Sequence, residues 1–167
     1  MKHTIFSILF LAFSIAVGRA QTEYANPTIS IGIIVSDIET SLDFYTKIMG
    51  MKETGGFSID ETFGKRSGLS GGTPFDVKIL KVVDDPNATE LKLVTFGNEK
   101  TTPDKHIQDQ NGMQYTTYFI KSTDKILQRL KENNIPLLGE TPINLPDGRT
   151  FILFQDPDGV FVEVIGN

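Results

Sequence analysis

The strongest constraint on the fold of this 167-residue chain is an order of predicted elements that occurs twice. Residues 28–35 are mostly β-branched and apolar on both faces, which predicts a buried strand. A helix is predicted next, because Ser36 and Asp37 are good N-cap residues, apolar side chains recur every three or four positions, and Gly50 ends the pattern. The first unit then ends with three predicted strands, at 51–59, 75–83 and 90–96.

The same order returns after a polar linker at 97–111. A strand is predicted at 113–120, and a helix capped by Ser122, Thr123 and Asp124 continues to about residue 133. Three short strands are predicted after it, at 135–139, 149–154 and 161–165. Two successive units of this kind, at 28–96 and 112–167, indicate an internal duplication. The predicted fold class is therefore α+β, with each helix on one face of its sheet and the other face free.

A glycine-rich polar stretch at 60–74 interrupts the first unit. A phosphate-binding loop would need Gly-Lys followed by Ser or Thr and then a helix, but Gly64 and Lys65 are followed by Arg66. We therefore predict a mobile loop here rather than a phosphate site.

The first twenty residues differ from the rest of the chain. Lys2 and His3 precede an uncharged run at 5–17, and the small residues Gly18 and Ala20 follow, which is typical of a cleavable secretory signal peptide. The alternative is a retained membrane anchor, but the run is shorter than the roughly 20 residues that a membrane-spanning helix needs. The expected organisation is a signal peptide at 1–20, a short lead at 21–27 and one domain at 28–167. We expect the protein to be secreted or periplasmic, with no membrane attachment after cleavage.

Composition excludes several classes of function. The chain has no cysteine, so thiol catalysis, cysteine-ligated zinc, iron–sulfur clusters and disulfide bonds are excluded. Cleavage after Ala20 would remove Lys2 and Arg19 and no acidic residue, leaving 14 basic against 21 acidic residues and a net charge of −7. That balance argues against a nucleic-acid partner. His106 would be the single remaining histidine.

Two motifs resemble a known superfamily. The segment SDIETSLDFYTKIMGMK at 36–52 is similar to the first-helix signature of the vicinal oxygen chelate superfamily, which includes glyoxalases, extradiol dioxygenases and the bleomycin- and fosfomycin-resistance proteins. The segment FQDPDGVFVEVI at 154–165 resembles its C-terminal signature, an Asp-Pro-Asp-Gly turn that leads into the last strand. The resemblance covers 27–166 and implies two tandem βαβββ modules that form a curved mixed-sheet cup, with the helices on its outer face. Neither motif indicates a particular reaction.

The resemblance also identifies four positions at which the superfamily usually holds a divalent metal. Ser30 and Tyr115 stand where histidines are usual, Lys92 stands where a glutamate or similar ligand is usual, and Glu163 retains the glutamate of the last strand. A shift of two residues would put Glu90 in place of Lys92. Serine and tyrosine are weak metal ligands, and an ammonium group competes with the cation. The resemblance therefore implies a degenerate metal site: we assign no metal ligand and expect no cofactor, while a divalent metal stays open.

Strand alternation predicts which side chains line the cup. The predicted ligand-binding residues, which are mostly apolar, are Ser30, Ile34, Phe96, Thr117, Phe119 and Phe161. Such a lining is typical of a small-molecule pocket. The candidate catalytic residues are Glu163, Tyr115 and Lys92, for which two interpretations compete. Lys92 and Glu163 form a buried ion pair with Tyr115 hydrogen-bonded to it, or Glu163 is a general base while Tyr115 or Lys92 stabilises an oxyanion.

The leading hypothesis is an exported glyoxalase-like protein that binds a small molecule without a metal. The first alternative is a metal-free isomerase or lyase with Glu163 as general base, and weaker ones are a metal-dependent glyoxalase or dioxygenase and a structural dimer module. Dimers are common in the superfamily, so a homodimer is an expected assembly. Arg66 and Arg149 are either exposed arginines or contacts to an anionic ligand at the rim of the cup.

Overall fold

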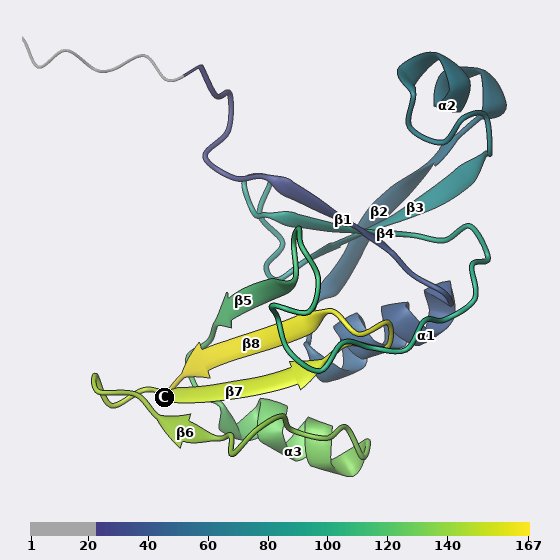
Figure 1. The fold of residues 1–167 in the computed structure, drawn as a ribbon. Coiled ribbons are helices and arrows are strands. Elements are labelled where there is room, and N and C mark those ends of the chain that lie inside the picture. Colours follow the sequence, from purple (N-terminus) through teal and green to yellow (C-terminus); the bar gives the residue numbers. More distant parts are fainter. Residues whose placement is uncertain (1–22) are drawn as a thin grey trace, which may run out of the picture.

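The computed structural model describes residues 23–167, whose eight strands form two four-stranded sheets with the same order of strands (Figure 1). In spatial order, sheet A contains β1 (Ser30–Ile34), β4 (Glu90–Val94), β3 (Phe75–Lys81) and β2 (Lys52–Ile59). Sheet B contains β5 (Tyr115–Phe119), β8 (Phe161–Gly166), β7 (Thr150–Gln155) and β6 (Ile143–Asn144). The first pair in each sheet is parallel and the other pairs are antiparallel. The repeated topology confirms the predicted α+β fold of two tandem mixed-sheet modules.

The helix of each module begins near its predicted cap. The Asp37 side chain accepts a hydrogen bond from the Thr40 amide at 2.6 Å and caps α1 (Ile38–Asp43), which continues as the π-helical segment η1 (Phe44–Ile48). In the second module, α3 (Asp124–Glu132) follows Thr123, whose amide donates to the Asn167 carbonyl at 2.7 Å. Within residues 23–167, no helix is long and apolar enough to cross a membrane. The predicted signal peptide lies outside the described residues.

The predicted loop at 60–74 is wrong in its first half, because it contains helix α2 (Glu61–Ser67). The Asp60 side chain accepts a hydrogen bond from the Phe63 amide at 2.7 Å, which caps the helix. Gly68, with φ of 78°, ends it in the left-handed conformation that glycine adopts readily. These cap residues outweigh the low helix propensity of the glycine within the helix.

The strand predicted at 135–139 is also wrong. That segment makes a single backbone bond to the neighbouring strand, from the Leu138 amide to the Leu153 carbonyl at 2.8 Å. Pro136 has no amide proton to donate, which prevents a regular ladder at its position. The strand paired with β7 comes later, as the two-residue β6.

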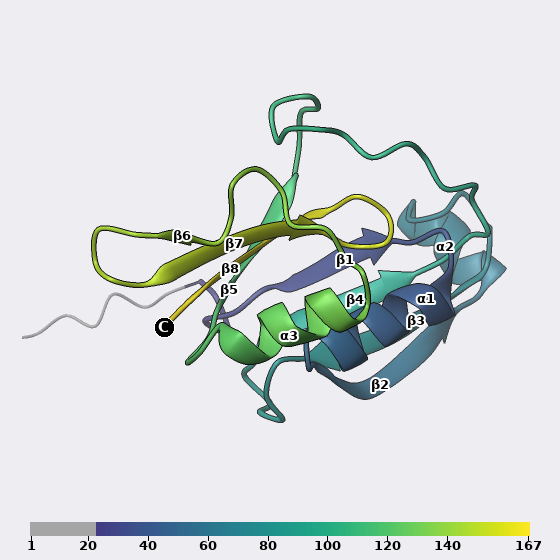
Figure 2. The same ribbon diagram turned by 90° about the horizontal axis from the view of Figure 1, so that it is seen from below.

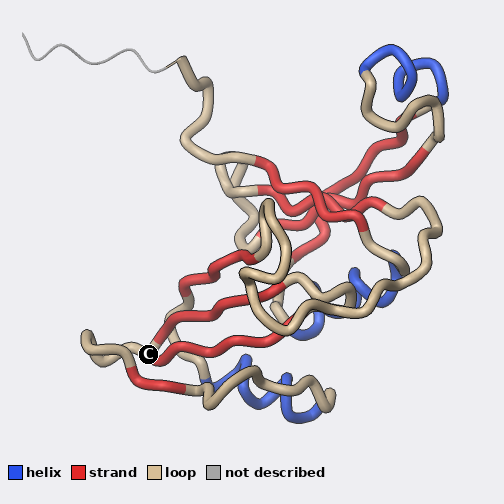
Figure 3. Tube along the Cα trace, viewed as in Figure 1, coloured by secondary structure: helices blue, strands red, loops and turns tan. Residues whose placement is uncertain are grey.

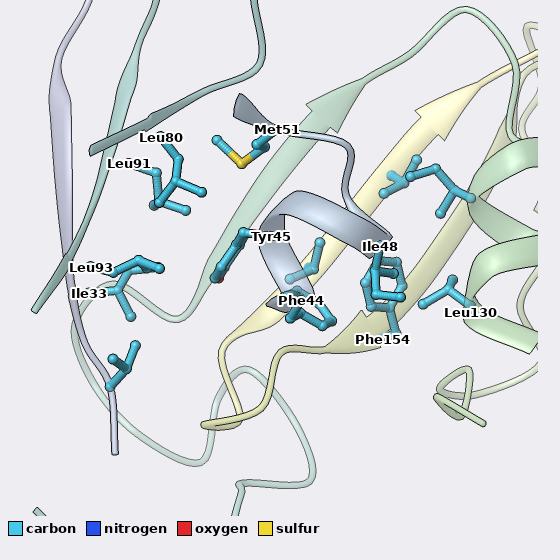
Figure 4. Packing of buried hydrophobic residues seen from close by; sticks show 14 of the residues in the cluster. Ile33, Phe44, Tyr45, Ile48, Met51, Leu80, Leu91, Leu93, Leu130 and Phe154 are labelled. Carbon is cyan, nitrogen blue, oxygen red and sulfur yellow. The ribbon is translucent and has the colours of Figure 1, made fainter. Parts of the chain in front are cut away.

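One hydrophobic core lies between the two sheets and includes both main helices. Figure 4 shows side chains of sheet A pointing toward η1, with Phe154 of sheet B and Leu130 of α3 on the other side of it. The Phe44 ring lies 5.0 Å from the Tyr45 ring and 6.2 Å from the Phe154 ring. Figure 2 shows α1 and α3 side by side, and Figure 3 shows the linker as a long loop from β4 to β5. Because side chains alternate along a strand, the other face of each sheet points away from this core.

The two segments that carry the family resemblance contact each other. Asp158 accepts hydrogen bonds from the Ser36 amide at 3.0 Å and from the Ser41 hydroxyl at 3.2 Å. Asp156 accepts one from the Tyr45 hydroxyl at 2.8 Å. Burial raises the pKa of both Asp156 and Tyr45. The Asp-Pro-Asp-Gly turn therefore ties the last strands of module two to the first helix of module one.

Candidate functional site

The face of sheet A that points away from the core is polar at one end and apolar at the other. Strand pairing places its side chains in rows across the four strands. The first row, which is polar, contains Lys52, Lys81, Glu90 and Ser30. The second contains Gly55, Ile79, Lys92 and Gly32, and the third, which is apolar, contains Phe57, Val77, Val94 and Ile34. The register thus places Ser30, Ile34 and Lys92 on one face, as predicted.

Glu90 is the centre of the polar end of sheet A. Its Oε2 accepts a hydrogen bond from the Ser30 hydroxyl at 2.9 Å and lies 3.5 Å from the Lys92 Nζ. Its Oε1 lies 3.6 Å from the Lys81 Nζ. The Ser30 hydrogen bond, with smaller contributions from the two lysines, lowers the pKa of Glu90. The Lys92 Nζ also lies 5.8 Å from the centre of the Phe57 ring, within the range of a cation–π contact.

The corresponding face of sheet B is more apolar. Its rows are Tyr115, Phe161 and Gln155; then Thr117, Glu163 and Leu153; and then Phe119, Ile165, Phe151 and Ile143. Glu163 is the one charged residue of these rows, and its Oε2 accepts a hydrogen bond from the Thr117 hydroxyl at 2.6 Å. Beyond the rows, the Arg149 guanidinium lies 5.8 Å from the centre of the Phe119 ring. The five predicted site residues of module two therefore share one face.

Phe96 follows the end of β4, and its ring lies 5.0 Å from that of Phe75. Phe75 pairs with Ile59 and has the same alternation as Val77, so this aromatic pair extends the apolar end of the sheet A face.

Lys92 and Glu163 occupy equivalent positions, as the third residues of β4 and β8. However, among the ion pairs of the described residues, Lys92 is joined to Glu90 and none joins it to Glu163. Glu163 is bonded to Thr117 instead. The two faces lie on opposite sides of a shared core, so a single chain does not assemble the predicted ion pair.

The sequence reasoning missed Lys81 and Phe57, which lie near Lys92 on the face of sheet A. Both follow from alternation once β2 and β3 are paired: Lys81 lies beside Glu90, and Phe57 lies two rows from it. The signal for both residues is present in the sequence, in the alternation of these two strands.

A groove of about 690 Å³ follows the free edge of β5. Tyr115, Thr117 and Phe119 line it, together with apolar residues such as Ile31 and Leu91 from the core side of sheet A. Its volume lies in the range of small-molecule pockets. The groove connects the face of sheet B that carries Glu163 with the space between the two modules.

The residues at the four superfamily positions do not fit a divalent metal. They supply a hydroxyl, an ammonium, a phenol and one carboxylate, of which the ammonium repels a cation. Across residues 23–167, no three His, Cys, Asp or Glu side chains gather as a metal site would require. His106 is an exposed residue of the linker, with Nδ1 3.9 Å from Asp109.

Comparison with known families agrees with the repeated topology and with the contact between the segments at 36–52 and 154–165. A sequence model of the glyoxalase/bleomycin resistance protein/dioxygenase superfamily matches residues 28–164. The chain belongs to this superfamily. Comparison with curated protein sequences finds no match.

Solved structures of glyoxalase-like proteins have the same fold. A glyoxalase family protein from Bacillus cereus is 16% identical, with 88% of this chain and 97% of that chain covered and a TM-score of 0.69. A mutant of glyoxalase I from Zea mays is 18% identical, with 84% of this chain and 45% of that chain covered and a TM-score of 0.61. A mutant fosfomycin resistance protein from Listeria monocytogenes, in complex with Mn(II) and a dihydroxypropylphosphonic acid, is 15% identical, with 83% and 90% covered and a TM-score of 0.54. At such identities the likeness establishes the fold alone.

Proposed function

We propose that this protein binds a small molecule on the faces that carry Lys92 and Glu163, and that it does so without a metal. The observation that supports this most strongly is Lys92, whose ammonium stands at a position where the superfamily resemblance expects a metal ligand. The ammonium lies 3.5 Å from the Glu90 carboxylate. It carries a positive charge where a metal would otherwise bring one. Around it, the rows of apolar side chains have the composition of a ligand pocket. The composition of residues 1–20 supports export of the mature domain.

Metal independence is tested by isothermal titration of the mature protein with Zn²⁺, Ni²⁺ and Mn²⁺. We expect no binding at micromolar concentration. One-to-one micromolar binding of any of the three ions would contradict the proposal. A triple variant, Ser30→His, Lys92→Glu and Tyr115→His, supplies the ligand types that the resemblance expects and is the positive control.

We also propose that a second copy of the chain completes the cup. Large apolar side chains on the two faces are 45–70% exposed in the single chain: Ile34, Phe57, Tyr115, Phe119 and Ile143. Apolar side chains that are exposed together on one face are typical of an interaction surface. Contact between sheet A of one copy and sheet B of the other would bring Lys92 and Glu163 to the same space.

The assembly is tested by light scattering coupled to size-exclusion chromatography. We expect a dimer for the wild type and a monomer for Phe119→Asp, because a charge would be buried in the interface. Phe63→Asp is the matched control, since Phe63 is 54% exposed on α2 and belongs to neither face. A monomeric wild type, or dissociation by both substitutions alike, would contradict the proposed contact.

A second candidate function is a metal-free isomerase or lyase with Glu163 as general base. It is favoured by the 2.6 Å hydrogen bond that orients one oxygen of Glu163 and leaves the other without a hydrogen bond among the described residues. The test is proton exchange in deuterated water, followed by NMR on a panel of small ketones and 2-oxo acids. Glu163→Gln should abolish exchange and keep the fold, whereas Glu90→Gln should retain it. Exchange that survives in Glu163→Gln would rule out this base.

A further inference from the structure

The face of sheet A concentrates positive charge in an acidic chain. Its paired rows carry Lys52, Lys81 and Lys92 against Glu90, a surplus of two positive charges. The whole chain has a net charge of −5. Adding the single charge of the sheet B rows, Glu163, leaves the combined rows positive. A local excess of this sign raises the concentration of anions at the surface.

We propose that this face binds a small amphipathic organic anion, with its acid group at Lys92 and its apolar body on the row that contains Phe57 and Ile34. The inference rests on the proposed function and names the class of ligand for the same site. The two ends of such a ligand match the two ends of the face.

Lys92 is the cation best placed to bind the acid group. Lys81 is already occupied, because its Nζ lies 3.2 Å from the Asp85 carbonyl in addition to its contact with Glu90. The Lys92 Nζ lies 3.5 Å from Glu90, longer than a normal N–H···O hydrogen bond of about 2.7–3.2 Å. An ammonium group has three N–H donors, so Lys92 retains donors for a ligand.

The surroundings of Lys92 leave room for that ligand. Gly32, which pairs with Lys92, and Gly55, in the same row, have no side chain. A Cβ added at either glycine would meet nothing within 4 Å. The Lys92 side chain is itself 30% exposed. The row is therefore open directly around the ammonium.

The apolar row of sheet A that would contact the body of the ligand lies at a defined distance from Lys92. Phe57, Val77, Val94 and Ile34 form the next row, two residues along each strand from Lys92 or its neighbours. Val77 and Val94 are buried, whereas Phe57 and Ile34 are 45% and 51% exposed and provide the contact surface. Two residues of a strand span roughly 7 Å. A ligand whose acid group and ring or aliphatic part are separated by about this distance, such as an aryl or alkyl carboxylate or sulfonate, would contact both rows.

The test uses two fluorescent probes that differ by one charge, 1-anilinonaphthalene-8-sulfonate and the neutral N-phenyl-1-naphthylamine. We expect the wild type to bind the sulfonate at least ten times more tightly than the neutral probe. Lys92→Met should weaken binding of the sulfonate about ten-fold and leave binding of the neutral probe unchanged. In this variant Glu90 still has Ser30 and Lys81 as partners, so its carboxylate is not left unpaired. Phe57→Ala should weaken both probes, which locates them on this face.

The controls distinguish a failure of the anion inference from a failure of the proposed function. Lys78→Met removes the same charge from β3. Alternation directs the Lys78 side chain to the other face of the sheet, where it pairs with Glu53 at 3.0 Å. This substitution should therefore not change sulfonate binding. Lys92→Gln, which keeps a polar side chain, serves if Lys92→Met does not fold. Equal affinity of the wild type for both probes, or equal effects of the Lys92 and Lys78 substitutions, would overturn the anion inference alone. Failure of both probes to bind would contradict the proposed function itself.

Discussion

Replacing Tyr45 with phenylalanine removes one hydroxyl group from the contact between the two modules. Tyr45 is fully buried, and Asp156 is 5% exposed, so water cannot replace the lost 2.8 Å hydrogen bond. The phenylalanine ring keeps the edge-on contact with Phe44, and no large cavity forms. Hydrogen bonds to a charged group are worth about 1.5–3 kcal/mol, so we expect the free energy of unfolding to fall by about 2 kcal/mol. For a domain of this size that corresponds to a fall in melting temperature of about 4–8 °C.

Urea unfolding at neutral pH, followed by circular dichroism, measures this change. Tyr115→Phe is the matched control: it removes the same group from a side chain that is 47% exposed, and its effect should stay within about 0.5 kcal/mol. A loss for Tyr45→Phe no larger than that of the control would refute the argument that the two motifs stabilise the fold through this bond.

Three further predictions concern pH and packing. Burial raises the pKa of Asp156 in the folded state above its ordinary value of 3.8. Between the ordinary pKa and the raised one, the folded state binds more protons than the unfolded state, so stability should fall as pH rises through this window. Urea unfolding at a series of pH values, with Asp156→Asn as the reference, measures this fall. Ser30→Ala removes the main cause of the lowered pKa of Glu90, and an NMR titration should show that pKa moving up toward 4.5, whereas an unchanged value would assign the shift to the lysines. Gly166→Ala would put a Cβ 2.6 Å from the Ile120 carbonyl oxygen, so the strand must shift; we expect a loss of about 1–3 kcal/mol by urea unfolding, and wild-type stability would contradict the contact.

The main elements of the fold were predictable from local sequence signals. The β-branched run at β1 and the cap at Asp37 each specify an element within a few residues, and the structure has both. Helix α2 was missed because the glycines after it obscured the cap at Asp60. The apolar composition of 135–139 favoured a strand, but Pro136 has no amide proton to donate to a ladder, and the segment makes a single backbone hydrogen bond to β7.

The site was predictable in part. All four superfamily positions were expected in one cup; the register confirms that Ser30 and Lys92 share a face of sheet A and that Tyr115 and Glu163 share a face of sheet B. The sequence did not reveal that both helices pack into one core between the sheets, which separates Lys92 from Glu163 within a chain. It also did not reveal Lys81 as a partner of Glu90, because that contact depends on long-range pairing of β3 with β4.

The most direct test of ligand binding without a metal is a crystal structure of protein purified from its natural host without chelators, with anomalous scattering measured for transition metals. We predict density for an organic molecule with its acid group at Lys92 and its apolar part on Phe57 and Ile34, and no anomalous peak near Glu163. An anomalous peak for a metal bound by Glu163, or faces filled by the protein's own side chains, would contradict it.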